Sequence, residues 1–310
     1  MTDAAIAPVE AQPGLLASPR LMAGERARVL VTGASGMLGS DLTPALAGAG
    51  YDVYPRPRES LDVTDESGVA AAFAELDPHF VVNCAAFTNV DACESNPAAW
   101  IVNFRGVRNL ARQCSRHGAR LVHVSTDFVF DGEKTTPYVE GDETAPLSMY
   151  GLTKRAGEEA ALQSPSALVV RSSWLFGRGG WNFIEAILTQ AEEGRRELSV
   201  VDDQRGKPTA TTDLSEAIIA LLAANASGIF HFANRGEVTW CDFARAILLL
   251  AGRNDVSVRP VSSADLARPA RRPGYSVLDT SKYEALTGRP IRHFQEPLIE
   301  YVAGRARPEA

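Results

Sequence analysis

The sequence predicts an α/β fold in which a Rossmann-type, doubly wound parallel sheet carries a smaller C-terminal lobe. Short apolar runs rich in β-branched residues alternate with helical segments between residues 28 and 171. A glycine-rich turn follows the first of these runs, at Gly33. The length of 310 residues suits one large α/β domain or two closely joined ones.

The first half of the chain supplies the regular alternation. Residues 28–32 form an apolar run that ends at glycine, which is typical of a buried parallel strand. The helix that follows, at about 36–49, is stopped by Gly48 and Gly50. We then expect strands at 52–54, 80–83, 120–125 and 167–171, and helices at 67–76, 97–116 and 150–162.

The second half is less regular and predicts a lobe over the sheet. Helices are expected at 182–193, 213–224 and 240–251, and strands at 198–201 and 229–232. We expect residues 26–175 to form the sheet domain, with about 198–224 returning to it, and residues 176–310 to form most of the lobe. Residues 1–25, rich in Ala and Pro, are predicted to be a disordered extension.

Composition excludes several classes of protein. The net charge of -7 argues against a nucleic-acid partner, because phosphate binding needs a basic face. No apolar run reaches about 18 residues and no signal peptide is evident, so we expect a cytoplasmic protein without a membrane span. The four cysteines and five histidines show no metal-ligand spacing, and no metal ligands are predicted.

The turn Gly33-Ala-Ser-Gly36-Met-Leu-Gly39 is typical of a dinucleotide-binding loop. Its glycines permit a tight turn, close approach to a pyrophosphate and close helix–strand packing. The helix N-terminus then offers free N–H groups to the phosphates. The predicted contacts are Gly33, Ser35, Gly36, Met37, Leu38 and Gly39.

The residues after the second strand indicate which nicotinamide cofactor is used. A carboxylate there binds the 2′-hydroxyl of NAD, whereas arginine suits a 2′-phosphate. Arg56 and Arg58 occupy this stretch, and no acid appears before Glu59. We therefore predict NADPH, with NADH as the alternative, and place Asp62 and Val63 at the adenine pocket.

The predicted reaction centre consists of Thr126, Tyr150 and Lys154. Tyr150 and Lys154 lie one helical turn apart on the same face. An ammonium so placed can stabilise a phenolate, which allows the tyrosine to exchange a proton near neutral pH. Thr126 follows the strand 120–125, whose carboxyl end is where a parallel sheet places its chemistry.

With these motifs the chain resembles the extended short-chain dehydrogenase/reductases and, within that group, the dTDP-4-dehydrorhamnose reductases. The resemblance spans nearly the whole folded chain. It is carried by the glycine loop with its strand (31–39), the segments 83–94 and 124–132, the Tyr-Lys motif (150–154), and the segments 171–177, 203–209 and 272–279.

The resemblance implies a role for each residue. Tyr150 would donate a proton to the C4 oxygen of a keto-sugar, and Lys154 would hold the nicotinamide ribose and lower the pKa of the tyrosine. Thr126 would hydrogen-bond the carbonyl. Asn103 would bind a relay water or act as a structural cap. The remaining implied contacts are Ala85, Ala86 and Thr88 for the cofactor, and Thr88, Val90, Asp127, Phe128, Trp174 and Arg272 for a dTDP-sugar.

The resemblance also implies a monomer or a homodimer, with Mg²⁺ as an option whose ligands the sequence does not identify. Phe128 replaces a tyrosine common in the family, so another deoxysugar 4-ketoreductase remains open. A sugar-nucleotide dehydratase or epimerase is disfavoured because Phe128 follows Asp127 where dehydratases typically carry a glutamate. A regulatory subunit, resembling that of methionine adenosyltransferase, is disfavoured by the intact Thr126, Tyr150 and Lys154.

Overall fold

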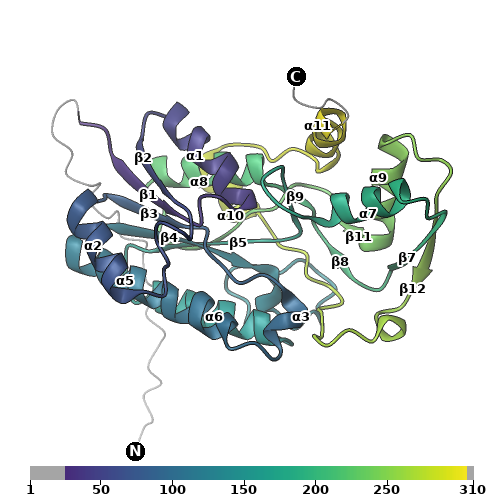
Figure 1. Ribbon diagram of the computed structural model, residues 1–310, viewed down its shortest axis with the longest axis horizontal. Coiled ribbons are helices and arrows are strands. Elements are labelled where there is room, and N and C mark those ends of the chain that lie inside the picture. Colours follow the sequence, from purple (N-terminus) through teal and green to yellow (C-terminus); the bar gives the residue numbers. More distant parts are fainter. Residues whose placement is uncertain (1–24, 306–310) are drawn as a thin grey trace, which may run out of the picture.

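A six-stranded parallel sheet forms the centre of the computed structural model, which describes residues 25–305. Helices cover both faces of the sheet, and the lobe extends from one end of the elongated molecule (Figure 1). The predicted α/β fold with a parallel sheet is confirmed. The extension expected at residues 1–25 lies, apart from its last residue, outside the described residues.

The sheet has the strand order β10-β5-β4-β3-β1-β2. These strands are β1 (Arg28–Thr32), β2 (Asp52–Arg56), β3 (Phe80–Asn83), β4 (Arg120–Thr126), β5 (Leu168–Ser172) and β10 (Gly228–His231). The helices packed around them are α1 (Met37–Gly48), α2 (Glu66–Leu76), α5 (Val107–His117), α6 (Met149–Ala161), α8 (Thr211–Ala223) and α10 (Ser281–Thr287).

The strands read as unbroken apolar runs because both of their faces are buried. Val29 and Val31 of β1 point into one hydrophobic cluster, which includes residues of α1, α8 and α10. Leu30 points into the other, which includes residues of α2, α5 and α6. This alternation follows from the two-residue period of a strand, and it needs apolar residues at every position.

The strand order places a topological switch point between β1 and β3. The chain leaves β1 towards β2 on one side, while β3 pairs with β1 on the other side. Ligands of such sheets bind outside the carboxyl ends of the strands at this point. Gly33 and Cys84 are the residues that follow the two strands, so the predicted glycine loop lies at the switch point.

The lobe has its own small sheet and its own core. β7 (Glu197–Val201) pairs in parallel with β12 (Ser257–Val261), and the third hydrophobic cluster draws on three helices. These are α7 (Phe183–Glu192), α9 (Trp240–Leu250) and α11 (Gln295–Arg305). The remaining lobe and linking elements are β6 (Leu175–Phe176), β8 (Arg205–Gly206), β9 (Thr209–Ala210), β11 (Val238–Thr239) and the 3-10 helix η3 (Ser263–Leu266).

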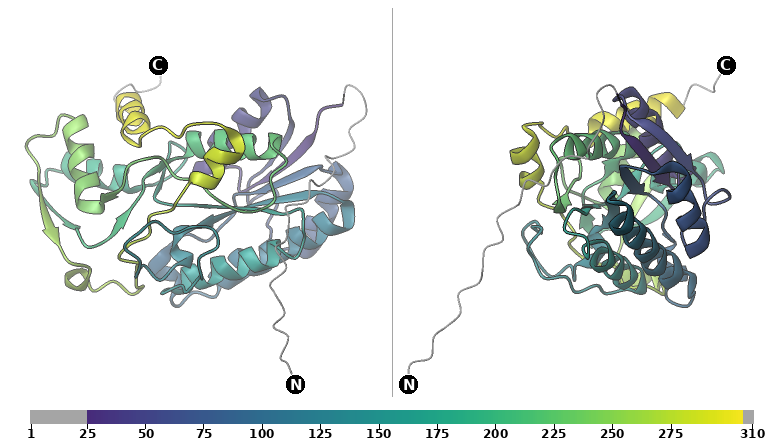
Figure 2. Two further views of the ribbon diagram at one scale, coloured as in Figure 1. Left: turned by 180° about the vertical axis from the view of Figure 1, so that it is seen from behind. Right: turned by 90° about the vertical axis from the view of Figure 1, so that its left-hand side faces the viewer.

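The chain crosses back from the lobe to the sheet through α8 and β10. α8 packs on α1, and β10 forms the edge of the six-stranded sheet beside β5. Figure 2 shows this returning segment from behind, with α10 alongside it. The range expected to return, about 198–224, included β7, which instead pairs with β12 because both strands cover the lobe core.

The helix expected at 97–116 is present, but it is not a regular α-helix throughout. It begins as α4 (Ala98–Trp100), widens into a π-helical segment, η1 (Ile101–Gly106), and continues as α5. Short helices at α3 (Val90–Cys93) and η2 (Asp127–Val129) were not predicted, and neither were β12, α10 and α11. Within residues 25–305, no helix combines the length and the apolar character that a membrane span requires.

Candidate active site

The glycine loop touches the loop that follows β3. Gly33 has a φ of 65°, and a Cβ built on it would lie 2.6 Å from the amide nitrogen of Ala85. Any other residue at position 33 would be strained and would push the two loops apart. Gly39 similarly packs its backbone against the carbonyl oxygen of Gly33. The first and last glycines therefore bring the two loops and α1 together at the switch point.

The N-terminus of α1 is free to bind an anion. Gly36 is its N-cap, no side chain caps the helix, and no acid stands in its first turn. Backbone N–H groups left without a partner at such an end attract a phosphate. Ser35 and Gly36 are exposed there and Met37 is half-buried, whereas Leu38 packs into the core. The loop thus fits the pyrophosphate of a dinucleotide, with Leu38 contributing packing.

The two arginines after β2 differ in their placement. The carbonyl oxygen of Arg56 accepts a hydrogen bond from the Ala34 amide at 3.3 Å, so Arg56 borders the glycine loop. Its guanidinium lies 3.5 Å from Glu75. The Arg58 side chain is 79% exposed and lies 3.7 Å from Asp62. Arg56 is therefore the better placed of the two to meet a phosphate beside the loop.

The two predicted adenine contacts, Asp62 and Val63, follow the arginines in the chain. Asp62 accepts hydrogen bonds from the backbone amide and hydroxyl of Thr64, and these bonds lower the pKa of its carboxyl group. Val63 is buried and packs against Gly106 of η1, where a Cβ would come within 2.6 Å of the valine methyl group. Val63 therefore belongs mainly to the packing between the segment after β2 and η1.

The π-helical segment braces the loop that holds Ala85, Ala86 and Thr88. The Asn103 side chain is fully buried, and its oxygen accepts the Phe87 amide at 2.8 Å. Its nitrogen donates to the Phe87 carbonyl at 3.0 Å and to Thr153 Oγ1 at 3.1 Å. Of the two roles left open for Asn103, the structural one matches this geometry, because the side-chain amide is occupied by these contacts.

Thr126, Tyr150 and Lys154 come together at the carboxyl end of β4. Ser148 caps the N-terminus of α6 and sets the position of its first turn. The Tyr150 hydroxyl lies close enough to Thr126 for the threonine to lower its pKa. The Phe128 ring meets the Tyr150 ring edge to face at 5.6 Å. Lys154 is buried one turn further along the helix and donates from Nζ to the Val124 carbonyl at 2.7 Å.

The electrostatics of Tyr150 differ from the expectation drawn from the Tyr-Lys spacing. Burial raises the pKa of Tyr150, the neighbouring Thr126 opposes this rise, and the nearby Asp127 adds to it. Burial also lowers the pKa of Lys154 to about 8. The expected lowering of the Tyr150 pKa by Lys154 is absent because the lysine is directed to Val124. Tyr150 is therefore a neutral phenol, as a proton donor must be.

Asp127 lies directly beneath the reaction centre. Burial raises the pKa of its carboxyl group to about 6, against hydrogen bonds from Ser276 and Thr126. The Thr126 hydroxyl donates to Asp127 Oδ1 at 3.0 Å, and the Phe128 amide donates to Thr126 Oγ1 at 3.2 Å. Asp127 thus orients the threonine hydroxyl from below.

Trp174 connects the sheet to the lobe. Its φ of 48° is unusual for a bulky residue, and its ring stacks on Trp240 of α9 with centroids 3.6 Å apart. Gly206 lies against the ring, and a Cβ there would come within 2.5 Å of it. The Trp174 indole is therefore held between Trp240 and Gly206 at the carboxyl end of β5.

Two predicted substrate contacts, Val90 and Arg272, lie around α3. Arg272 binds both carboxylate oxygens of Asp91 at 2.9 Å and is otherwise largely buried. This pairing joins the C-terminal segment to α3. It also occupies the guanidinium group of Arg272, which was predicted to bind a diphosphate. Val90, the first residue of α3, is half-buried beside Asp91, whereas Thr88 is exposed just before the helix. The roles of Val90, Thr88 and Arg272 with a substrate remain predictions.

Sequence reasoning missed the polar groups beneath Lys154. His123 on β4 and Asn83 on β3 are fully buried and hydrogen-bonded to each other. Glu158 and Arg171 form a buried ion pair behind them, with contacts of 2.9 and 2.7 Å. Polar residues inside otherwise apolar strands were the available signal.

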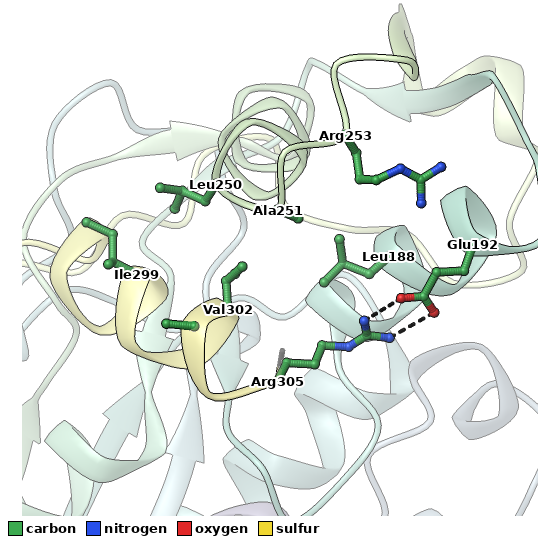
Figure 3. Close-up of a pocket in the computed structure, with 9 residues that line it drawn as sticks. Leu188, Glu192, Leu250, Ala251, Arg253, Ile299, Val302 and Arg305 are labelled. Carbon is green, nitrogen blue, oxygen red and sulfur yellow. Dashed lines mark hydrogen bonds and ion pairs between the residues drawn. The ribbon is translucent and has the colours of Figure 1, made fainter. Parts of the chain in front are cut away.

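A separate pocket of about 410 Å³ opens in the lobe between α7, α9 and α11. Figure 3 shows its apolar wall, including Leu188, Leu250 and Val302, with the Arg305–Glu192 ion pair at one side. None of its lining residues belongs to the predicted sites. In the described part of the chain, no group of three or more His, Cys, Asp or Glu side chains is arranged to hold a metal ion.

Comparison with known proteins gives concordant matches. The family described as RmlD substrate binding domain matches residues 27–306. A dTDP-4-dehydrorhamnose reductase from Streptomyces griseus is 47% identical over 283 residues, covering 89% of this chain and 93% of that protein. A dTDP-4-keto-6-deoxy-D-glucose reductase from Streptomyces niveus is 44% identical over 276 residues, covering 88% and 96%.

A solved structure agrees with these matches along the whole sheet and lobe. The dTDP-4-dehydrorhamnose reductase from Bacillus anthracis, in complex with NADP, superposes with a TM-score of 0.85 at 36% identity. The match covers 91% of this chain and 100% of that one. The motifs, the fold and these relatives therefore show that the chain belongs to the RmlD substrate binding domain family.

Proposed function

We propose that this protein uses NADPH to reduce the C4 ketone of a nucleotide-activated 6-deoxysugar. The proposed substrate is dTDP-4-dehydro-β-L-rhamnose and the product is dTDP-L-rhamnose. One observation carries the proposal: the Tyr150 phenol, which burial keeps neutral, lies beside Thr126 at the carboxyl end of β4. The name of the Streptomyces griseus relative supports the choice of substrate.

The proposed mechanism assigns proton transfer to Tyr150. A ketone oxygen bound beside the Tyr150 and Thr126 hydroxyls would accept a hydrogen bond from Tyr150. It would accept a second one from Thr126 once that hydroxyl turns its proton from Asp127 to the ketone, and both bonds polarise the carbonyl group. The bound nicotinamide supplies the hydride for the carbonyl carbon. Tyr150 gives its proton to the oxygen as negative charge develops there. Lys154, buried one turn away with its Nζ on the Val124 carbonyl, would bind a hydroxyl of the nicotinamide ribose.

The choice of NADPH rests on the edge of the glycine loop. Arg56 ends β2 beside that loop, and the stretch before Glu59 holds no carboxylate to bind a 2′-hydroxyl. The Bacillus anthracis relative was solved with NADP, which supports the same choice. We also propose that the protein is cytoplasmic and that its partner is a dTDP-sugar. The family resemblance further leads us to expect a monomer or a homodimer, with Mg²⁺ as an option.

A second candidate is a 4-ketoreductase that acts on a different deoxysugar. The Streptomyces niveus relative is named as a dTDP-4-keto-6-deoxy-D-glucose reductase. Phe128 packs on Tyr150 where the family commonly carries a tyrosine, so one hydroxyl is missing from the wall of the pocket. That change alters which sugar hydroxyls find a partner there.

The two candidates are separated by their products. The purified protein is incubated with NADPH and either dTDP-4-dehydro-β-L-rhamnose or dTDP-4-dehydro-6-deoxy-D-glucose, and cofactor oxidation is followed by absorbance. Proton NMR of the product then identifies the configuration at C4. Preferential turnover of the first sugar to dTDP-L-rhamnose supports the proposal, and preferential turnover of the second supports the alternative. Absence of oxidation with both would contradict a ketoreductase and leave a binding role.

A further inference from the structure

A row of buried polar side chains crosses the sheet beneath Lys154. Thr32, Asn83 and His123 occupy matching positions on the neighbouring strands β1, β3 and β4. None of the three is more than 1% exposed. Their register places them on the same face of the sheet as Leu30, which is the face that α6 covers. Burying polar side chains costs free energy unless they are hydrogen-bonded. The hydrogen bonds within this row therefore show how each polar group is satisfied.

A backbone amide fixes the direction of these hydrogen bonds. The Ala85 N–H can only donate, and it donates to Asn83 Oδ1 at 3.2 Å. Thr32 Oγ1 donates to the same oxygen at 2.7 Å. The Asn83 amide nitrogen must then be the atom that faces His123 Nδ1, at 3.1 Å. Nδ1 accepts this bond, so a neutral His123 carries its proton on Nε2.

The protonated Nε2 points at the lysine. His123 Nε2 lies 3.5 Å from Lys154 Nζ. An ammonium group has donors only, so an N–H directed at it is repulsive, whereas the lone pair of a neutral amine can accept that N–H. The contact therefore favours the amine form of Lys154 over the ammonium form.

The other titratable groups around Lys154 are a buried thiol and a carboxylate that is already paired. Cys84, after β3, is a buried thiol whose pKa burial raises to about 12, so it is neutral. Glu158, on α6 itself, favours the ammonium form. Both of its oxygens are bound by Arg171 of β5. His123, on β4, is thus the neighbouring group that directs a hydrogen-bond donor at Lys154 Nζ and so opposes its protonation.

We infer that Asn83 and His123 act as positioning residues for Lys154, because they direct the Nε2–H of His123 at its Nζ and so weaken its hold on its proton. Burial acts in the same direction, since it lowers the pKa of Lys154 to about 8. Burial and Lys154 together hold the pKa of His123 well below its ordinary value, so the imidazole stays neutral. Only the catalytic consequence, an alkaline limit on reduction set by Lys154, rests on the proposed function.

The tautomer of His123 can be measured in the unmodified protein. The chain has five histidines, and long-range ¹H–¹⁵N correlation spectra distinguish a ring protonated at Nε2 from one protonated at Nδ1. The His123 signals are assigned by their loss in His123→Phe or, if that variant does not fold, His123→Leu. We expect an unprotonated Nδ1 and a protonated Nε2 between pH 6 and 9. A proton on Nδ1 would overturn the inference.

The proton affinity of Lys154 can be measured separately from turnover. The chain has four lysines, Lys134, Lys154, Lys207 and Lys282, so ¹³Cε-labelled lysine gives four resolvable titrations, assigned with single arginine variants. We expect Lys154 to titrate near pH 8 in the unmodified protein. His123→Phe keeps a ring but removes the Nε2–H, and it should raise the Lys154 pKa by about 1 pH unit.

Thr32→Val is the matched control. It removes one hydrogen bond from the same buried row, but the Ala85 amide still fixes Asn83, so the Lys154 pKa should stay unchanged. An equal Lys154 pKa in His123→Phe and in the unmodified protein contradicts the inference. So does an equal shift in both variants, which would indicate a general loss of packing. Because neither readout uses turnover, failure of the proposed reductase activity would be seen separately, as absence of cofactor oxidation.

Discussion

The residues at the reaction centre are specialised by their surroundings more than by their spacing. Tyr150 and Lys154 would sit one turn apart on any helix, but burial keeps the phenol protonated and weakens the ammonium. Thr126 is oriented from below by Asp127. A neutral donor beside a carbonyl-binding hydroxyl is what a reductase needs, since reduction consumes one proton at the ketone oxygen.

Replacement of Tyr150 by phenylalanine tests this role. Tyr150→Phe removes the proton donor and leaves the ring that packs on Phe128 in place. We expect kcat to fall by about 10²–10⁴ with NADPH affinity nearly unchanged. Steady-state kinetics and fluorescence titration of NADPH measure the two quantities. Turnover near that of the unmodified protein would show that another group protonates the substrate.

Replacement of Arg56 or Arg58 by alanine tests whether the protein prefers NADPH to NADH. Arg56→Ala should raise the KM for NADPH by about tenfold and change the KM for NADH little, because only NADPH carries the 2′-phosphate. Arg58→Ala is the matched variant, and its effect should be smaller because the Arg58 side chain is largely exposed. Equal losses for both cofactors in Arg56→Ala would remove Arg56 as the residue that recognises the phosphate.

At the level of elements, the decisive contact is between α6 and the π-helical segment η1. Gly157 of α6 faces the carbonyl oxygen of Asn103, and a side chain there would collide with it. The close approach lets Asn103 reach both the Phe87 backbone and Thr153 of α6. One glycine thus allows α6, which carries Tyr150, and the loop after β3 to be held together through Asn103.

Alanine at position 157 should separate these elements. Gly157→Ala should lower the free energy of unfolding by about 1–3 kcal/mol, because a buried methyl group must displace backbone. Gly48→Ala is the control. It is also a helical glycine, but nothing lies within 4 Å of its Cβ position, so it should stabilise α1 by about 0.5–1 kcal/mol. Chemical denaturation measures both, and a neutral Gly157→Ala would show that the two helices adjust without cost.

The sequence predicted the elements well where periodicity was strong. β3 was predicted with its observed bounds, and the glycine loop and Tyr150 were placed on the correct elements. The π-helical segment was not predicted, because its residues have the pattern of an ordinary amphipathic helix. The pairing of Arg272 with Asp91 joins residues far apart in the chain, and no local pattern reports such a contact.

At the scale of the whole molecule, buried histidines should make the fold sensitive to acid. Burial lowers the pKa of His231 to about 3 and that of His123 well below its ordinary value. An unfolded chain protonates each histidine as the pH falls below about 6.5, whereas the folded chain leaves both histidines neutral. The free energy of unfolding therefore falls as the pH drops below about 6.5. Asp127, whose pKa is raised to about 6, opposes this because its folded form takes up a proton first.

We therefore expect a net loss of stability between pH 7 and pH 5. His231 contributes about 2 kcal/mol of loss by pH 5, His123 adds to this loss, and Asp127 offsets about 1 kcal/mol. Urea unfolding at the two pH values measures the change. His231→Gln should flatten the dependence, and an unchanged slope in that variant would mean that His231 titrates normally in the folded protein.

The stacked indoles of Trp174 and Trp240 have a consequence for how the two parts of the molecule can be observed. One ring belongs to the end of the sheet and the other to a lobe helix. Their centroids lie 3.6 Å apart and their planes are within 6° of parallel. Two chromophores in such contact share their excited states, so the pair should give a distinctive near-ultraviolet circular dichroism band. The intensity of this band would report whether the lobe is packed against the sheet. It would decrease if the lobe moved away from the sheet.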